Sequence, residues 1–293
     1  MYYVVYGFLW LISILPFRVL YFFADCIYGL VFYVFKYRRE VVMNNIGIAF
    51  PEKSEKERRQ IAKKFYHNFL DAFIESIKFI TISKKQILKR SSAEFDTIND
   101  LTAKGYNVHI MAGHQFNWEF GNALAAMTLT APFVGIYMPI TNKALDRIFY
   151  DFRKRYGTIL ISATEFKKNA DHPAFSKQYT FGLAADQNPG DPSNGYWMNF
   201  FGRPVPFVTG PSKGAVKNNT AVVIVGFHKL KRGYYHFSTR ILTENGSSFS
   251  PEALTVLYKN ALEEIIRKDP SNYLWSHRRW KYEWKPEYGP IIE

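Results

Sequence analysis

A histidine and a glutamate, His114 and Glu119, have the residue types and spacing for acid–base chemistry. They follow an alternating apolar stretch, 108–112, that ends at Gly113 and predicts a strand running into a turn. A helix is expected to begin near Asn117, because asparagine is a favoured N-cap. The imidazole and the carboxylate could then meet across the turn, with His114 as general base and Glu119 fixing its tautomer. The alternative is a pair of polar residues exposed on a loop by chance.

Two later segments carry side chains suited to binding a charged substrate. The predicted helix 142–155 is rich in cations, and Arg153 or Arg155 could clamp a phosphate or carboxylate if this helix borders the histidine. Otherwise these cations form a solvated helix face. Asp186, followed by Gln187, ends an apolar strand, and ligands of α/β folds bind at the carboxyl ends of strands. A turn-forming aspartate is the equal alternative.

Two aromatic segments could border a ligand or simply cover the core. Arg203 is embedded in the aromatic loop 200–206, which could line a groove for an acyl chain. The segment 275–281 interleaves tryptophan with cations, as expected for arginine–tryptophan stacking near an anion or for a tryptophan-rich flap on a membrane. The complete set of predicted substrate-binding residues is Asn117, Arg153, Arg155, Asp186, Gln187 and Arg203.

A competing nucleophile lies in the segment 210–214, which matches G-x-S-x-G around Ser212. Asp269 and His277 follow in serine-hydrolase order, so a serine esterase is the alternative enzyme class. A nucleophile elbow needs a buried central strand before the serine, and the prolines that precede Ser212 disfavour one. A helix N-terminus with glycine for close packing is the favoured interpretation.

Charge and cysteine content limit the partners. The chain of 293 residues has 38 Lys and Arg against 25 Asp and Glu, a net charge of +13. This excess suits nucleic acid, anionic lipid or an acidic carrier protein, but a clustered basic helix or an RNA-binding signature is missing, so no nucleic-acid partner is predicted. The single cysteine, Cys26, excludes a disulfide framework. No set of histidines has metal-ligand spacing, and we expect neither metal nor cofactor.

The N-terminus predicts a membrane anchor. Two apolar runs, 2–15 and 19–35, are each shorter than the about 20 residues of a straight spanning helix. They could form one tilted span, a hairpin in one leaflet or an interfacial anchor, and two buried helices of a soluble protein are the alternative. Basic residues at 36–39 follow, which favours a cytoplasmic location for the rest of the chain.

The remaining chain predicts one α/β domain, with a mixed central sheet flanked by helices. Ser54 and Glu57 form a capping box that opens a long amphipathic helix. From about residue 91 strand and helix patterns alternate. Strands are expected near 106–112, 132–138, 158–161, 179–185, 220–227 and 234–241, and helices near 118–128, 142–155, 212–218 and 251–267. The predicted division is a membrane anchor, 1–37, and a catalytic domain, 38–293, made of a helical lead-in, 38–90, and an α/β body, 91–293.

Together these motifs resemble the bacterial lipid A biosynthesis late acyltransferases, the lauroyl/myristoyl transferase family, within the H-x4-[DE] glycerolipid acyltransferases. The resemblance covers nearly the whole chain, including the apolar N-terminus, 39–52, 113–119, 186–187, 200–202 and 275–281. It implies a glycerolipid acyltransferase-like fold and transfer of a fatty acyl chain from acyl carrier protein to a hydroxyl of a lipid A precursor of the Kdo-lipid IVA type. His114 would be the base and Glu119 its partner, without an acyl-enzyme or cofactor.

The resemblance further implies an enzyme of lipopolysaccharide biosynthesis at the bacterial inner membrane, with the catalytic domain on the cytoplasmic side. Its partners would be acyl carrier protein, an anionic saccharolipid and the membrane. Two positions depart from the family pattern: Phe116 stands where many members have glycine, and Met138 where many have arginine. The missing arginine leaves acyl transfer to another lipid or glycolipid open. A non-catalytic lipid-binding protein is the third alternative.

Overall fold

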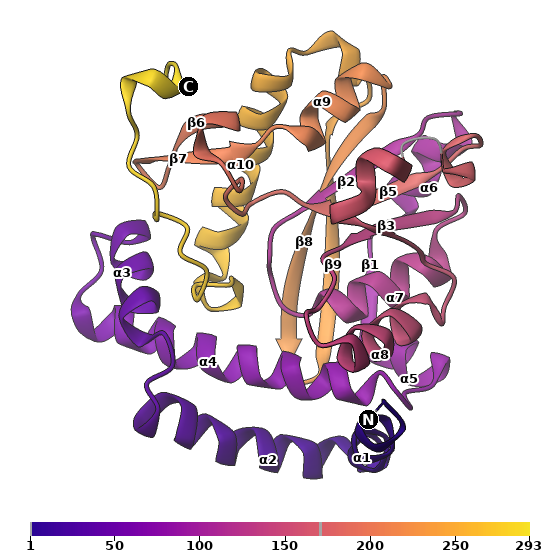
Figure 1. The fold of residues 1–293 in the computed structure, drawn as a ribbon, viewed down its shortest axis with the longest axis vertical. Coiled ribbons are helices and arrows are strands. Elements are labelled where there is room, and N and C mark those ends of the chain that lie inside the picture. The colour runs from indigo at the N-terminus through magenta and orange to yellow at the C-terminus, as the bar shows by residue number, and fades with distance from the viewer. Residues whose placement is uncertain (1, 170–171) are drawn as a thin grey trace.

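The computed structural model describes residues 2–169 and 172–293, and it confirms the predicted α/β fold with a mixed central sheet (Figure 1). The sheet has the strand order β1-β9-β8-β2-β5-β3-β4. Only the hairpin pair β8–β9 is antiparallel within it. Its strands are β1 (Ser91–Ala93), β2 (Val108–Ala112), β3 (Phe133–Tyr137), β4 (Ile159–Ser162), β5 (Thr180–Ala184), β8 (Ala221–Lys231) and β9 (Tyr234–Thr243).

Helices cover both faces of the sheet, and successive side chains of β8 point alternately into the two cores. Val222 and Ile224 pack into one core, whereas Val223 and Val225 pack into the other. A strand buried on both faces reads as a continuous apolar run, as here. The α-helices of the described residues are α1 (Tyr2–Ile14), α2 (Phe17–Gly29), α3 (Arg39–Ala49), α4 (Glu55–Lys78), α5 (Lys84–Arg90), α6 (Asp96–Ala103), α7 (Trp118–Thr128), α8 (Lys143–Lys154), α9 (Gly210–Lys217) and α10 (Pro251–Lys268).

The predicted capping box starts α4. The Ser54 hydroxyl accepts from the backbone N–H of Glu57 at 3.3 Å, and the Glu57 carboxylate accepts from the backbone N–H of Ser54 at 2.8 Å. This long helix crosses beneath the sheet and supports both the N-terminal helices and the core (Figure 1). It therefore connects the apolar N-terminus to the rest of the fold.

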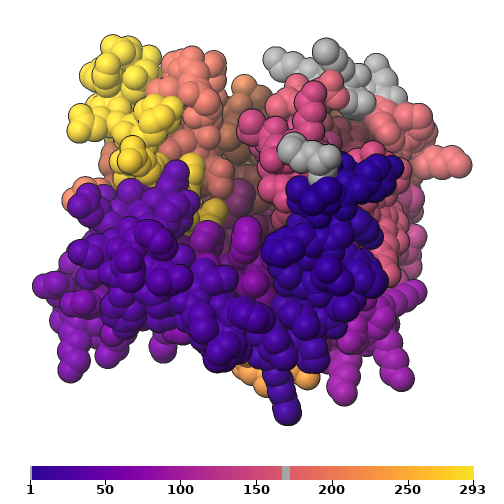
Figure 2. Space-filling model, turned by 60° about the horizontal axis from the view of Figure 1, so that its bottom comes forward, coloured from indigo at the N-terminus to yellow at the C-terminus, as the bar shows by residue number. Residues whose placement is uncertain are grey.

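The two apolar N-terminal runs form the separate helices α1 and α2, with Pro16 between them. A π-helical turn, Leu30–Val34, extends α2, and Phe17–Val34 is long and apolar enough to cross a membrane. However, α2 runs alongside α4 (Figure 1) and buries one face, which includes Leu20 and Ala24. Of the stretch Phe17–Val34, 28% is buried, so most of its apolar surface faces outward. In Figure 2 the indigo N-terminal segment forms an outer surface of the molecule.

The aromatic segment 200–206 is a hairpin and not the predicted loop. Strands β6 (Gly195–Phe200) and β7 (Arg203–Val208) pair in a small antiparallel sheet of their own. The turn residues Phe201 and Gly202 have φ of 51° and 73°, as tight hairpin turns require. Proline is tolerated in an edge strand such as β7, so the prolines of this segment are compatible with either a strand or a loop. Phe200 and Phe201 are buried, so the hairpin covers the core.

Candidate active site

The central feature of the site is a contact between the two strand ends that the sequence singled out. His114 Nδ1 lies 2.6 Å from Asp186 Oδ1, and the His114 backbone N–H donates to Asp186 Oδ2 at 3.1 Å. The contact follows from the sheet, because β2 and β5 are parallel neighbours with Ala112 opposite Ala184. The residues two positions beyond each strand end therefore meet at the same edge. The imidazole is paired with Asp186, and the predicted pairing with Glu119 is wrong.

Burial and charge shift the pKa values of His114 and Asp186 in opposite directions. Burial lowers the pKa of His114, but the charge and hydrogen bond of Asp186 more than compensate, so the pKa of the imidazole is raised above 6.5. Burial would raise the pKa of Asp186, yet His114, with a hydrogen bond from Tyr273, brings it down to about 2. The hydrogen-bond network assigns the proton of neutral His114 to Nδ1, which leaves a lone pair on Nε2. That nitrogen can act as a general base.

Glu119 forms a second buried pair on the other side of the turn. Arg153 Nε lies 3.0 Å from Glu119 Oε2, and Arg153 Nη2 lies 2.5 Å from Glu119 Oε1. Trp118 Nε1 also donates to Oε1, at 3.0 Å. The Glu119 side chain is 1% exposed, so its charge is neutralised by the guanidinium. The guanidinium that the sequence predicts as a clamp for a substrate phosphate or carboxylate holds the protein's own Glu119 carboxylate.

Asn117 supports the turn from within the protein. As N-cap of α7 its Oδ1 accepts from the backbone N–H of Glu119 at 3.0 Å, which fixes the first helical turn. Its Nδ2 donates to Glu75 Oε2 at 2.8 Å. Both polar atoms are used inside the protein and the residue is 1% exposed, so Asn117 does not line the cavity as the substrate-binding prediction required. The predicted N-cap role is confirmed.

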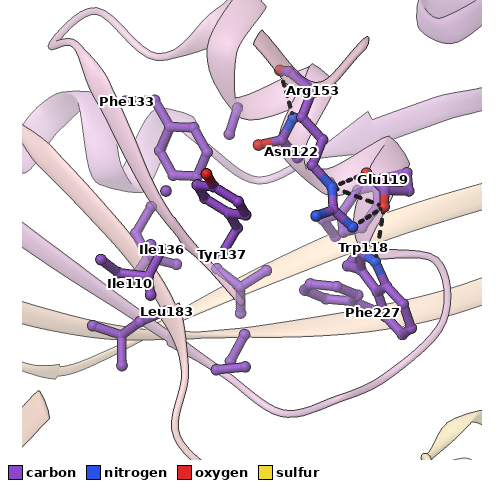
Figure 3. Close-up of a pocket in the computed structure, with 18 of the residues that line it drawn as sticks. Ile110, Trp118, Glu119, Asn122, Phe133, Ile136, Tyr137, Arg153, Leu183 and Phe227 are labelled. Atoms are coloured by element: carbon purple, nitrogen blue, oxygen red, sulfur yellow. Dashed lines mark hydrogen bonds and ion pairs between the residues drawn. The ribbon is translucent and has the colours of Figure 1, made fainter. Parts of the chain in front are cut away.

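A cavity of about 330 Å³ opens beside both pairs, within the range of small-molecule sites. It runs between α7 and the sheet, and most of its lining is apolar. In Figure 3 the Arg153–Glu119 pair and Trp118 lie on one side, with Phe133 and Tyr137 across the cavity. His114 also lines it. The other lining residues shown by label in Figure 3 are Ile110, Asn122, Ile136, Leu183 and Phe227.

The remaining predicted substrate-binding residues are Arg155, Arg203 and Gln187, and the cavity lining includes none of them. Arg155 is exposed and donates to the Ile80 carbonyl at 3.1 Å. Arg203 is exposed at the first position of β7. Neither residue is part of the cavity lining. Gln187 is half-buried and directly follows Asp186.

A C-terminal strap, residues 272–280, closes the back of the segment 113–119 between β2 and α7, which we call the catalytic turn. Leu274 N–H donates to the His114 carbonyl at 3.0 Å, and Asn45 Nδ2 donates to the carbonyls of Trp275 and His277, each at 2.7 Å. Trp275 and Arg279 are 0% and 1% exposed, which contradicts the alternative of a tryptophan-rich flap on a membrane. The role of Asn45 escaped sequence reasoning, because its partners are backbone carbonyls about 230 residues away.

The geometry around Ser212 disfavours the serine esterase alternative. Its hydroxyl donates to the Thr209 carbonyl at 3.2 Å and accepts from the Thr255 hydroxyl at 2.8 Å. The side chain is buried within α9, and β7, which precedes it, is outside the central sheet. An exposed nucleophile at the end of a central strand is the arrangement the esterase needs. Within residues 2–169 and 172–293, no group of three or more His, Cys, Asp or Glu is placed to hold a metal ion.

Comparison with known proteins gives the chain its family. It is 23% identical over 286 residues to the lipid A biosynthesis lauroyltransferase of Escherichia coli (strain K12), covering 97% of this chain and 92% of that protein. It is 23% identical over 277 residues to the palmitoleoyltransferase of the same organism, covering 94% and 89%. A Haemophilus influenzae lipid A biosynthesis acyltransferase is 22% identical over 244 residues, 82% of this chain and 74% of that protein. Residues 1–282 match the family described as bacterial lipid A biosynthesis acyltransferase, and the chain belongs to that family of acyltransferases.

Proposed function

We propose that this enzyme moves a fatty acyl chain from acyl carrier protein to a hydroxyl of a lipid A precursor of the Kdo-lipid IVA type, with His114 as general base. The observation that carries the proposal is the His114–Asp186 contact of 2.6 Å beside an apolar cavity. A paired imidazole supplies the base, and an apolar cavity suits a fatty acyl chain.

The reaction needs no enzyme-bound acyl intermediate. Nε2 of His114 removes the proton from the acceptor hydroxyl as its oxygen attacks the thioester carbonyl. The tetrahedral oxyanion then collapses, the carbon–sulfur bond breaks, and the imidazolium returns the proton to the departing thiolate. Asp186 holds the ring and stabilises the imidazolium, as the third member of a nucleophile–base–carboxylate arrangement does. Orientation of the two substrates supplies much of the remaining rate enhancement.

Arg153 is the proposed electrostatic partner of the oxyanion or of an anionic acceptor group. Its Nε and Nη2 are bonded to Glu119, and no residue of the described chain accepts from its Nη1. Arg153 lines the cavity that also holds His114. A guanidinium fixed by a buried carboxylate is preorganised, which is the condition for strong transition-state stabilisation. The role we give Glu119 is to hold Arg153 in place.

The outward surfaces fit the proposed partners. A net charge of +13 suits an acidic carrier protein and a phosphorylated saccharolipid. The outer face of α1 and α2 exposes large apolar side chains, which suit attachment to a bilayer. With the basic residues of 36–39 beyond them, the catalytic domain would lie on the cytoplasmic side of the inner membrane. The exposed apolar side chains of these helices include Tyr3, Phe8, Leu11, Phe22, Phe23 and Ile27.

A second acceptor class is supported by one residue. Met138 lines the mouth of the cavity and is 66% exposed, where an arginine would be expected to contact an anionic acceptor. Without that cation, another lipid or glycolipid hydroxyl becomes a candidate acceptor.

The test is acyl transfer by detergent-purified protein, using labelled acyl carrier protein and the tetra-acylated lipid A precursor. Wild type is compared with His114→Ala and with Arg155→Ala, which changes an exposed cation outside the cavity. We expect product from wild type and Arg155→Ala, and none from His114→Ala. Full activity of His114→Ala would overturn the proposed base. Transfer to a different lipid only, still lost in His114→Ala, would support the second acceptor class.

A further inference from the structure

A buried carboxylate outside the cavity joins the N-terminal apolar helix to the catalytic turn. Glu75 of α4 is 0% exposed, and none of the ion pairs between described residues includes it. Instead three neutral groups donate to it: Tyr21 Oη at 2.6 Å, Tyr235 Oη at 2.6 Å and Asn117 Nδ2 at 2.8 Å. Burial raises the pKa of this carboxyl group. Burying such a group is costly, so its place in the fold calls for an explanation.

The three donors come from different parts of the molecule. Tyr21 lies on α2, which carries the outward apolar surface, whereas Tyr235 lies on β9 in the sheet. Asn117 caps α7 and bonds the backbone N–H of Glu119 at 3.0 Å. A continuous hydrogen-bonded route therefore leads from α2 through Glu75 to the helix turn that holds Glu119.

We propose that Glu75 is a positioning residue that couples the docking of α2 on α4 to the geometry of the catalytic turn. The Tyr21 hydroxyl orients the Glu75 carboxylate, which in turn holds the Asn117 side chain in the rotamer that caps α7. With the cap in place Glu119 points at Arg153. When α2 leaves α4, the cap loses one of its supports and the Glu119–Arg153 pair is less well held. The inference rests on the proposed function, because it assumes that this pair serves the reaction.

The position of α2 on α4 has a second support that bypasses Glu75. Asp25, one helical turn beyond Tyr21, accepts from Arg232 Nη2 at 2.7 Å, and Arg232 also bonds Asp71 at 2.6 Å. This ion pair attaches α2 to the β8–β9 turn without contacting the catalytic turn. Asp25→Asn therefore weakens an ion pair of α2 but leaves the Tyr21–Glu75 hydrogen bond in place, and it serves as the control for Tyr21→Phe.

The experiment measures kcat, KM for both substrates, thermal unfolding and hydrogen exchange of the amides of 117–121 in the full chain. Glu75→Gln retains an acceptor for Asn117 and a donor for the Tyr21 oxygen, so we expect near-wild-type kcat. Glu75→Leu removes both, and we expect kcat to fall about tenfold with KM unchanged, the kinetic equivalent of a lost buried hydrogen bond. For Tyr21→Phe we expect kcat to fall about threefold and the 117–121 amides to exchange faster.

Asp25→Asn should leave kcat and the exchange of 117–121 within about twofold of wild type, a change too small for a lost catalytic contact. The inference is overturned if Glu75→Leu lowers only the unfolding temperature, or if Tyr21→Phe and Asp25→Asn have the same effect on kcat. If Glu75→Leu fails to fold, the Tyr21→Phe and Asp25→Asn comparison still decides. If the wild type transfers no acyl chain, the proposed function is contradicted. Hydrogen exchange of the 117–121 amides would still test the route from Tyr21 to Glu119.

Discussion

Two buried carboxylates, Asp186 and Glu119, lie on opposite sides of the catalytic turn, and each holds a basic side chain that lines the cavity. Asp186 and Glu119 are each 1% exposed, with closest contacts of 2.6 Å to His114 and 2.5 Å to Arg153. The imidazole changes charge near neutral pH, whereas the guanidinium is always charged. The first pair can exchange a proton with substrate, and the second can only supply a fixed charge. The difference shows that the histidine and the glutamate of an H-x4-E spacing can belong to separate pairs.

The largest expected effect is the loss of the proton-exchanging group. His114→Ala should lower kcat by about 10⁴-fold, the upper end of the range for general acid–base catalysis. KM should change little, because the apolar cavity that binds the acyl chain is retained. Steady-state acyl transfer measures both constants, with circular dichroism as the folding control. A fall of less than tenfold would mean that proton exchange at this pair is not central.

Removing the charge of Asp186, the partner of His114, should have a smaller effect on kcat. In Asp186→Asn the ring keeps its place but loses the carboxylate that fixes the tautomer and stabilises the imidazolium. We expect kcat to fall about 10²-fold, the lower end of the range for general acid–base catalysis and less than for loss of the base itself. The same assay at pH 8 provides the measurement. An equal loss in Glu119→Gln would remove the distinction between the two pairs.

The pH dependence separates the pairs more sharply than the rates do. The base must be neutral, so kcat/KM should fall as pH drops through the pKa of His114, which Asp186 raises above 6.5. In Asp186→Asn the raising charge is gone, and burial then lowers this pKa, so the acid limb should move to lower pH. In Glu119→Gln the limb should stay where it is in wild type. A profile that shifts equally in both variants would contradict the assignment of His114 to Asp186.

Loss of the Glu119–Arg153 ion pair should lower both the unfolding free energy and kcat. Glu119→Gln leaves Arg153 buried without a counter-charge, and removal of one partner of a buried ion pair costs about 3 kcal/mol of unfolding free energy. We expect kcat to fall about tenfold, as Arg153 loses its orientation. Urea unfolding and acyl transfer measure the two effects. Arg240→Gln, which breaks an exposed ion pair with Glu264 at 2.7 Å, is the control and should change neither.

Much of the fold could be predicted because its signals are local. The apolar runs of β2 and β8, the Ser54 capping box and the asparagine cap of α7 all appear in the structure. Their geometry depends on neighbouring residues, so pattern and propensity suffice. The β6–β7 hairpin escaped prediction because Pro204 and Pro206 are compatible with both an edge strand and a loop.

The pairings within the site could not be predicted, because they depend on which strands are neighbours. The sequence predicts His114 and Asp186 each at a strand end, but their contact requires β2 to lie next to β5, and local pattern does not fix strand order. The spacing likewise predicts His114 as the partner of Glu119, although α8 brings Arg153 closer in space. Glu75 carried no sequence signal, since a glutamate on an amphipathic helix is usually solvated.

The smallest expected effect tests whether the cavity holds the acyl chain. Ala125 lines the cavity on α7, and Ala125→Ile should shorten the space for the acyl chain. Because each buried methylene contributes about 0.8 kcal/mol, kcat/KM for a chain with one methylene too many should fall about fourfold. A series of acyl carrier protein thioesters from ten to sixteen carbons measures the preference. Ala126→Ile, its neighbour outside the lining, should leave the preferred length unchanged, and a shift in both variants or in neither would place the acyl chain elsewhere.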